Sequence, residues 1–308
     1  MVGNLTLSKM NVRPEGYTIE QIDALPMALE GNGSSPQPSV QLKATYEMAN
    51  ATLSSGARIR VSHAGGFKCT ICDRPSKKLF DGACYPCFQN SAQADRCLLN
   101  PVSCHFTRGT CREPAWAEEF CYQPHYVYLA FTDKFKVGIT RKGQVPTRWF
   151  DQGATMAILL ARVGSRHQAG ILEHRLSETF ADKSHWMKML KAANSRPSAH
   201  EFLETRNTAL QILEKALSGE SSLQLRAPLP EGLPKAADIF LLNGAVLAEI
   251  EYPLWNAVPE KIAAVNLDKS PTVESTLFGI KGQYLFLDCG VFNVRRHEGY
   301  VVSCEILS

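Results

Sequence analysis

The stretch HYVYLAFTDKFKVGITRKGQVPTRWFDQGA, residues 125–154, carries the local patterns that decide the fold. Two runs rich in β-branched and aromatic residues, YVYLA and FKVGIT, are joined by a short polar connection and predict a β-hairpin. The segment VPTRWFDQG predicts a short helix, with Pro146 near its first turn and Gly153 after its end. Trp149 and Phe150 in this helix are expected in the core.

The same alternation continues after residue 154. MAILLARV, residues 156–163, has the length of a buried strand, and Ala169, Leu172, Leu176 and Phe180 recur at helical spacing. NTALQILEKALSG then predicts a second amphipathic helix. The order strand, strand, helix, strand, helix indicates a small mixed α/β core.

Both ends of the chain have short β-like runs separated by turns, and the C-terminal part reads as a β-meander. We expect these ends to pair into one sheet or barrel, which gives an α+β fold class. The segment SGESSLQLRAPLPEGLPK has the composition of a linker. The predicted organisation is a β-rich segment 1–66, a cysteine-rich module 67–125, an α/β domain 126–218, a linker 219–234 and a β-rich segment 235–308.

The composition is that of a globular protein, with 44% hydrophobic and 20% charged residues among 308. The first 25 residues have no apolar run of the kind found in signal peptides, and no stretch reaches the roughly 20 apolar residues that span a bilayer. We therefore expect a cytoplasmic protein without membrane association.

The net charge of +3 is unevenly distributed. Residues 58–112 carry +6 and residues 126–175 carry +5, which leaves −8 for the rest of the chain. Clustered Lys and Arg gain affinity for polyanions by releasing condensed counterions, so DNA or RNA is the expected partner. A solvated basic face without a partner would have the same composition.

Eight of the ten cysteines lie between Cys69 and Cys121. Cys69, Cys72, Cys84 and Cys87 form two C-x2-C pairs separated by 11 residues. Each pair puts two thiolates on one turn, and two turns complete a closed tetrahedral site that suits structural Zn²⁺. Reduced buried thiols or a redox pair are the alternatives.

A second metal site could form farther along the module, where Cys97 and His105 also lie. The expected ligands are Cys104, Cys111, Cys121 and His125, although buried structural cysteines would give the same pattern. Cys289 and Cys304 are expected in the C-terminal core.

The predicted elements bring Tyr128, Arg148 and Glu173 onto one surface, and Tyr126 shares a strand face with Tyr128. Such a set can act on phosphodiesters, because Glu can hold Mg²⁺ and Arg can neutralise charge on the phosphoryl group. The alternatives are that the tyrosines are half-buried strand residues and that Arg148 forms a salt bridge with Asp151 or Glu173.

Residues 126–180 resemble a divergent GIY-YIG nuclease domain of a branch common in phage proteins. The resemblance implies a three-stranded sheet flanked by helices and a catalytic set of Tyr128, Arg148 and the metal-binding Glu173. Lys136 stands where the family has its second-motif tyrosine, and Tyr126 where it has its first-motif glycine. The whole chain, with its cysteine block and the segments VGITR, TRWFDQGA and GIKGQYLFLD, also resembles an uncharacterised bacterial zinc-binding family of unknown function.

Three hypotheses follow. The first is an endonuclease-like enzyme that uses Tyr128, Lys136, Arg148 and Glu173 with Mg²⁺ or Mn²⁺. The second is a non-catalytic nucleic-acid-binding module with a degenerate nuclease site. The third is a thiol-redox or metal-sensing protein that uses the C-x2-C pairs.

Overall fold

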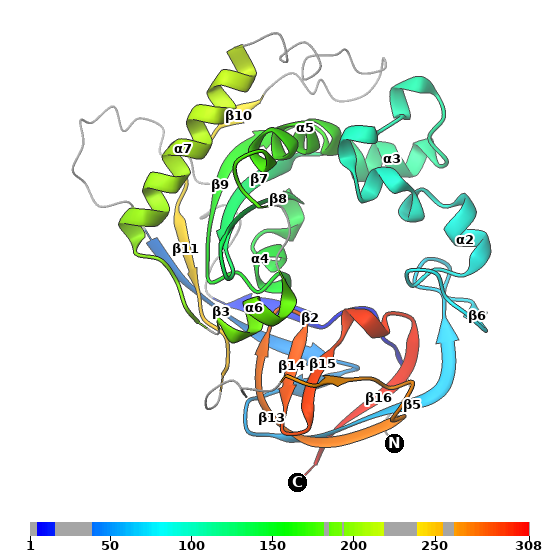
Figure 1. The fold of residues 1–308 in the computed structure, drawn as a ribbon. Coiled ribbons are helices and arrows are strands. Elements are labelled where there is room, and N and C mark those ends of the chain that lie inside the picture. The colour runs from blue at the N-terminus through cyan, green and yellow to red at the C-terminus, as the bar shows by residue number, and fades with distance from the viewer. Residues whose placement is uncertain are drawn as a thin grey trace.

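Two curled sheets, joined by one hydrophobic core, form the body of the protein in the computed structural model (Figure 1). The structure describes residues 5–15, 39–181, 185–192, 194–218, 239–254 and 262–307. Helices and mainly antiparallel strands are mixed in this part of the chain, which confirms the α+β fold class.

Sheet 1 joins the two ends of the chain, as predicted. Leu5 pairs with Val302, and Ile59 pairs with Ile306. In the order of pairing, the strands are β1 (Leu5–Thr6), β16 (Tyr300–Leu307), β5 (Arg58–Lys68), β13 (Thr272–Lys281), β14 (Tyr284–Leu287), β15 (Gly290–Asn293) and β12 (Ala264–Val265), with β6 (Pro75–Ser76) on β5.

Sheet 2 contains the predicted α/β core and strands from both ends of the chain. Its order is β2 (Asn11–Glu15), β3 (Ser39–Met48), β11 (Leu247–Ile250), β9 (Met156–Val163), β7 (His125–Phe131) and β8 (Phe135–Arg141), with β4 (Ala51–Leu53) on β3 and β10 (Phe240–Leu241) on β9. The β7–β8 hairpin is confirmed, and Tyr128 pairs with Gly138.

The predicted helices follow these strands. They are α4 (Thr147–Asp151), α5 (Arg166–Ser177) and α7 (Ala199–Ser218); the short helix α6 (Trp186–Lys191) and the 3-10 turn η5 (Lys142–Gln144) before α4 were not predicted. Trp149 and Phe150 are fully buried, as expected. Figure 1 shows α7 on the outer side of sheet 2, while α4 and α5 lie on its inner side.

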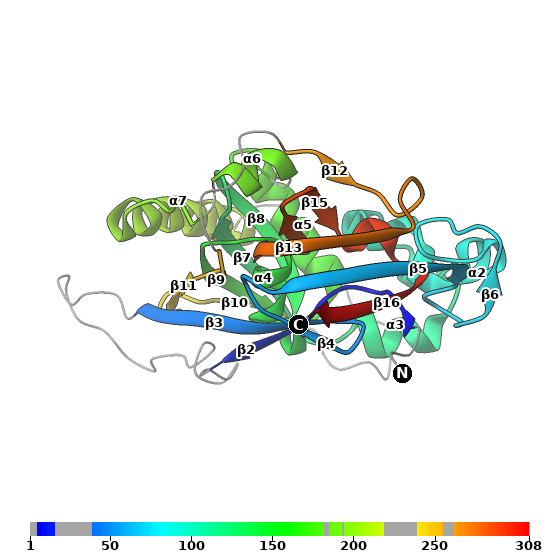
Figure 2. The same cartoon turned by 90° about the horizontal axis from the view of Figure 1, so that it is seen from below.

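The cysteine module, residues 67–125, consists of short helical turns with two small hydrophobic clusters. Figure 2 shows α7 and the part of the module that carries α2 and β6 at opposite ends of the molecule. The module's elements are α2 (Tyr85–Asn90), η1 (Ala92–Ala94), η2 (Arg96–Leu98), η3 (Pro101–Ser103), η4 (Phe106–Arg108) and α3 (Pro114–Cys121), and η6 (Arg295–His297) lies near the end of the chain.

The expectations for the linker, for Cys289 and for the domain division are not confirmed by the structure. The proposed linker 219–234 lies outside the described residues. Cys304 is buried, but the expectation for Cys289 is wrong, because it is exposed in the turn between β14 and β15. The five-segment division stays a prediction, and both sheets combine strands from several of those segments. Among the described helices, none has the length and apolar character needed to cross a membrane.

Candidate functional site

A cleft of about 500 Å³, here called the inner cleft, opens between the α/β core and the cysteine module. Most of its charged lining side chains are cationic. They are Lys9, Arg141, Arg148, Arg166 and Arg295, against the acidic Asp151 and Glu173. The cleft therefore offers positive charge around Glu173, an arrangement that suits a phosphate group and a divalent cation.

Helix α4 is held from both sheets, which fixes the backbone that carries Arg148. Asp151 accepts from Lys9 Nζ at 2.6 Å and from Gln283 Nε2 at 2.9 Å. The Tyr252 hydroxyl donates to the Ala154 carbonyl oxygen at 2.9 Å. Asp151 is therefore a partner of Lys9 and Gln283, and the salt bridge of Arg148 with Asp151 or Glu173 stays a prediction.

Helix α5 supplies Arg166 and Glu173, which lie seven residues apart and hence on one face of the helix. The side chain of Ser165 caps the helix by accepting from the Gln168 amide at 3.2 Å. Gly170 lies between the two charged residues, and a Cβ atom there would overlap Pro101 of η3. The missing side chain thus lets the cysteine module pack directly against α5.

Tyr128 lies next to the inner cleft and is completely buried. Its hydroxyl donates to Gln152 Oε1 at 2.9 Å, and Gln152 lines the cleft. Burial raises the pKa of Tyr128 to about 12; the charge and hydrogen bond of Arg148 oppose the shift, and the charge of Glu173 adds to it. Tyr128 therefore lies close to Arg148 and Glu173, and its raised pKa keeps the phenol protonated near neutral pH.

Lys136 lies apart from this group. It is buried on β8, with 5% of its surface exposed, and forms a bridge with Ala181. The β8 residues that line the inner cleft are Val137 to Arg141. Its assignment as a catalytic residue stays a prediction.

The first four predicted metal ligands converge. The sulfur atoms of Cys69, Cys72, Cys84 and Cys87, here called thiol cluster 1, lie within 4.8 Å of one another. Cys69 Sγ accepts from the amides of Ile71 and Cys72 at 3.4 and 3.5 Å. A hydrogen bond from Arg74 lowers the pKa of Cys72 to about 6. Thiol cluster 1 could therefore hold a metal ion in a closed site.

Three of the other predicted ligands line one cavity with Cys97, which was left out of that prediction, but the group in this part of the module whose donor atoms lie within 4.8 Å of one another is Asp95, Cys97 and His105. Cys104, Cys111 and Cys121 line a cavity of about 20 Å³ with Cys97. Burial raises the pKa of Cys121 to about 11; Arg166 opposes the shift, and Cys104 and Cys111 add to it. We call these four residues thiol cluster 2.

His125 lies on β7 and is not among the residues that line this cavity. Its Nδ1 lies 2.7 Å from the Gln123 carbonyl oxygen, and its buried Nε2 has no hydrogen-bond partner among the described residues. Burial lowers the pKa of His125 to about 4, so the ring is neutral at pH 7. Its assignment as a metal ligand stays a prediction.

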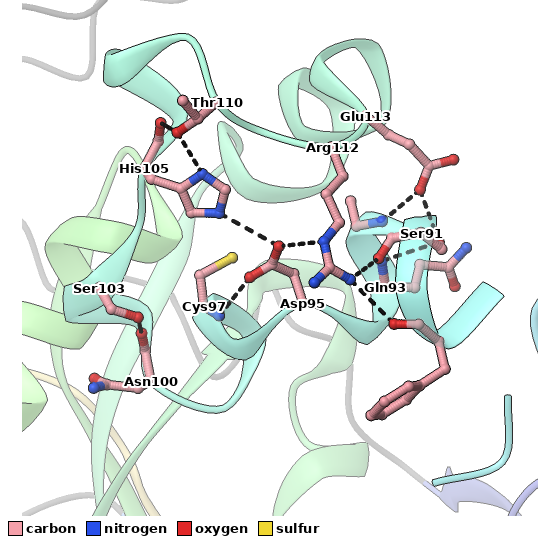
Figure 3. A network of polar contacts seen from close by, with 12 residues as sticks. Ser91, Gln93, Asp95, Cys97, Asn100, Ser103, His105, Thr110, Arg112 and Glu113 are labelled. Atoms are coloured by element: carbon pink, nitrogen blue, oxygen red, sulfur yellow. Dashed lines mark hydrogen bonds and ion pairs between the residues drawn. The ribbon is translucent and has the colours of Figure 1, made fainter. Parts of the chain in front are cut away.

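A polar network supports the loop that carries Cys97 (Figure 3). Asp95 accepts from the Cys97 amide at 3.1 Å and pairs with Arg112 at 2.9 Å and with His105 at 3.4 Å. Glu113 accepts from the Ala92 amide at 2.6 Å. The network replaces part of the apolar core that this segment lacks.

A second, larger cleft of about 1010 Å³, here called the outer cleft, adjoins the first. Leu98, Leu99 and Arg295 line both clefts. The outer cleft is lined by the basic Lys77, Lys78 and Arg296, the acidic Asp81, Asp95 and Glu298, and the aromatic Phe67, Phe88 and Tyr300. The two clefts therefore make one continuous depression, which is basic at the inner cleft and of mixed charge beside thiol cluster 1.

The sequence patterns did not identify Gln152, Arg141 or Arg166 as cleft residues. Arg166 had one usable signal, since it lies seven residues before Glu173 in a predicted helix. Gln152 had none, because its partner Tyr128 lies 24 residues away.

No curated protein and no solved structure matches the chain. The resemblance to GIY-YIG nucleases gains no support from these comparisons and stays a hypothesis. A family model described as a protein of unknown function, DUF2797, matches residues 56–302. Because this match covers most of the 308 residues and both thiol clusters, the chain belongs to the DUF2797 family.

Proposed function

We propose that this protein acts on nucleic acid and hydrolyses phosphodiester bonds in the inner cleft. The observation that carries the proposal is the meeting of Arg148 and Glu173 in one cleft, with Tyr128 interacting with both. The GIY-YIG resemblance assigns the same three residues. Arg141 and Arg166 add positive charge around them.

The outer cleft supports a polymeric substrate. A nucleic-acid strand in the inner cleft would continue past Arg295 to Lys77 and Lys78 beside thiol cluster 1. The exposed aromatic rings of Tyr85 and Phe88 lie in the same module. Distributed cations of this kind contact phosphates rather than base edges, so weak sequence preference is expected.

The donor atoms fit a single divalent cation held largely by its substrate. Mg²⁺ commonly binds through one or two carboxylates together with substrate phosphates, and Glu173 is the carboxylate on the cationic wall formed by α5. A bound Mg²⁺ or Mn²⁺ would supply Lewis acidity at a phosphate oxygen. Arg148 would neutralise charge that develops on the phosphoryl group.

Tyr128 has a positioning role in this proposal. A hydroxyl with a pKa of about 12 is protonated at pH 7 and is a poor base there. Its hydrogen bond orients Gln152, whose amide faces the cleft and can hold the attacking water.

Thiol cluster 1 is proposed to bind structural Zn²⁺. Four thiolates leave no open coordination position, so the metal would fix the loops that carry Arg74, Lys77 and Lys78. Structural zinc at this position accounts for a stable segment with few aliphatic residues.

The test compares Glu173→Gln with Glu178→Gln, an exposed carboxylate on the C-terminal side of the same helix. With Mg²⁺, the wild type and Glu178→Gln should cleave single-stranded, duplex or branched DNA or RNA, while Glu173→Gln binds without cleaving. Arg148→Ala should lose both rate and affinity, because the guanidinium meets phosphate in the ground and transition states. Cleavage by Glu173→Gln at the wild-type rate would refute the assignment.

A non-catalytic nucleic-acid-binding module is the second candidate. It is favoured by the burial of Lys136 away from the inner cleft. Under this function the wild type binds all of these substrates and cleaves none of them. Lys136→Tyr, which introduces the residue of the GIY-YIG family, should then be without effect on cleavage.

A further inference from the structure

Three different metal-ligating atoms meet in the middle of the cysteine module. They are a carboxylate oxygen of Asp95, the sulfur of Cys97 and a ring nitrogen of His105, and all lie within 4.8 Å of one another. Asp95 and Cys97 belong to the start of η2, and His105 directly precedes η4. Tetrahedral zinc with bonds of about 2.0–2.3 Å holds its ligand atoms about 3.3–3.8 Å apart, so small side-chain movements would bring these three atoms onto one ion.

The hydrogen bonds of Thr110 determine which ring nitrogen of His105 carries a proton (Figure 3). The Thr110 hydroxyl donates its one proton to the His105 carbonyl oxygen at 3.3 Å. Thr110 Oγ1 also lies 2.9 Å from His105 Nδ1, and in this contact it acts as the acceptor of an Nδ1–H group. In the neutral ring, Nε2 is therefore unprotonated and presents a lone pair.

This lone pair faces another acceptor. His105 Nε2 lies 3.4 Å from Asp95 Oδ2, and two acceptors at this distance repel each other unless a cation lies between them. The cation is either a proton on Nε2 or a metal ion. The sulfur of Cys97 favours the metal ion, because Zn²⁺ binds thiolate, imidazole and carboxylate together, whereas a proton needs no third donor.

Neighbouring side chains hold the three donors in the way that outer partners hold metal ligands. Arg112 Nε donates to Asp95 Oδ2 at 2.9 Å, and the Cys97 amide donates to Oδ1 at 3.1 Å. Each carboxylate oxygen has two lone pairs, so Asp95 can serve these donors and a metal ion at once. Thr110 fixes the ring of His105 through the nitrogen that would not bind the metal.

The charge and the space at this point also suit a divalent ion. One thiolate and one carboxylate balance its two positive charges, so the centre needs no further countercharge. The three residues line the cavity of about 20 Å³ described above, which has room for one ion or one water molecule. Three protein ligands leave one tetrahedral position, and a water molecule or one of the other thiols that line the cavity completes it.

We infer that Asp95, Cys97 and His105 bind a divalent metal ion of the zinc class, a ligand set different from the one predicted from the sequence. Binding releases the thiol proton of Cys97 to solvent. The ion joins η2 to the start of η4 and fixes the loop between them, which carries Leu98, Leu99 and Pro101 into the wall of the inner cleft. This inference is independent of whether the cleft is catalytic.

The first experiment counts zinc by elemental analysis in full-length variants that are equilibrated with Zn²⁺ and then freed of unbound metal. The wild type and the control His200→Gln, which changes a histidine with an 82% exposed side chain, should contain about two zinc ions per chain. His105→Gln, Cys97→Ser and Cys69→Ser should each contain about one, and Cys69→Ser/His105→Gln close to none. Fewer than two zinc ions in the wild type, or two in either His105→Gln or Cys97→Ser, would overturn the inference.

The second experiment needs no variant, so it does not depend on the folding of His105→Gln or Cys97→Ser. X-ray absorption at the zinc edge of the wild type gives the ligand atoms of both ions together. With four thiolates in thiol cluster 1, we expect about five or six sulfur atoms at about 2.3 Å and three or two nitrogen and oxygen atoms at about 2.0–2.2 Å, among eight ligands. About seven or eight sulfur atoms would mean a second site built mainly from thiolates and would refute Asp95 and His105 as a pair of ligands.

Discussion

Gly138→Ala should test how tightly the floor of the inner cleft is packed. A Cβ atom at Gly138 would lie 2.5 Å from the Tyr128 hydroxyl oxygen and 2.7 Å from its Cζ atom. Real Cβ atoms do not approach other atoms so closely, so one side chain must move. Tyr128 has little room to do so, since it is fully buried and hydrogen-bonded to Gln152.

The expected loss follows from two opposing contributions. Overpacking of a rigid core destabilises by about 1–3 kcal/mol. Replacing glycine by alanine at a compatible backbone conformation returns about 0.4–1 kcal/mol through the unfolded state. The free energy of unfolding of Gly138→Ala should therefore fall by about 1–2 kcal/mol.

The assay is urea denaturation at a fixed zinc concentration, because bound metal contributes to apparent stability. Gly143→Ala is the matched control, since the corresponding Cβ at this exposed position would have no atom within 4 Å. It should change stability by no more than about 0.5 kcal/mol.

Tyr128→Phe removes the atom that the new methyl group meets first. The double variant Gly138→Ala/Tyr128→Phe should therefore lose less stability than the sum of the two single variants. Equal stabilities of Gly138→Ala and Gly143→Ala, or strict additivity with Tyr128→Phe, would refute the packing around Tyr128.

Cys69→Ser should lose one zinc ion, and because structural zinc binding contributes directly to folding, its free energy of unfolding should fall by about 3 kcal/mol or more. The control Cys289→Ser should match the wild type in both metal analysis and denaturation. Burial lowers the pKa of Lys281 to about 8, so between pH 8 and its ordinary value of 10.5 the unfolded chain binds more protons and stability should rise with pH. Relative to Lys281→Met, that rise should be about 1 kcal/mol per pH unit above pH 8, and a constant difference between the two denaturation series would contradict it. The affinity for a DNA or RNA oligonucleotide should fall steeply with salt. Lys77→Ala/Lys78→Ala should reduce the slope of log K against log salt by about 2, while the control Lys43→Ala on sheet 2 leaves that slope unchanged. No binding at low salt would contradict both proposed functions.

Local patterns predicted the elements that depend on neighbouring residues. The hairpin around Lys134, the β9 strand and the helix α5 follow from alternation, length and helical spacing, and all are present. Pairing over long separations carried no such signal. Leu42 and Ile250 are partners in parallel strands although about two-thirds of the chain separates them, and neither segment indicates the other.

In the candidate site, too, local patterns predicted some residues, while others depend on the path of distant parts of the chain. The regular C-x2-C pairs predicted thiol cluster 1, because both turns bring their thiols together locally. Cys97 was left out of the second ligand set in favour of His125, because its place in the same cavity as Cys121 depends on the path of η3, η4 and α3, which the spacing does not show. The period of two placed Tyr126 and Tyr128 on one face, but both faces of β7 are buried, so the pattern did not show that Tyr128 would lie beneath the cleft.

The inner cleft exists only when distant parts of the chain are folded together. Arg148 depends on α4, which Lys9 from the N-terminal segment and Gln283 from the C-terminal segment hold through Asp151. Glu173 lies on α5, which packs against β8 and, at Pro101, against the cysteine module. Arg166 lines both the inner cleft and a small cavity that it shares with Cys97, Cys104 and Cys121. The cysteine module therefore forms one wall of the site through Leu98, Leu99, Pro101 and Phe120, whichever of the two proposed functions the cleft performs.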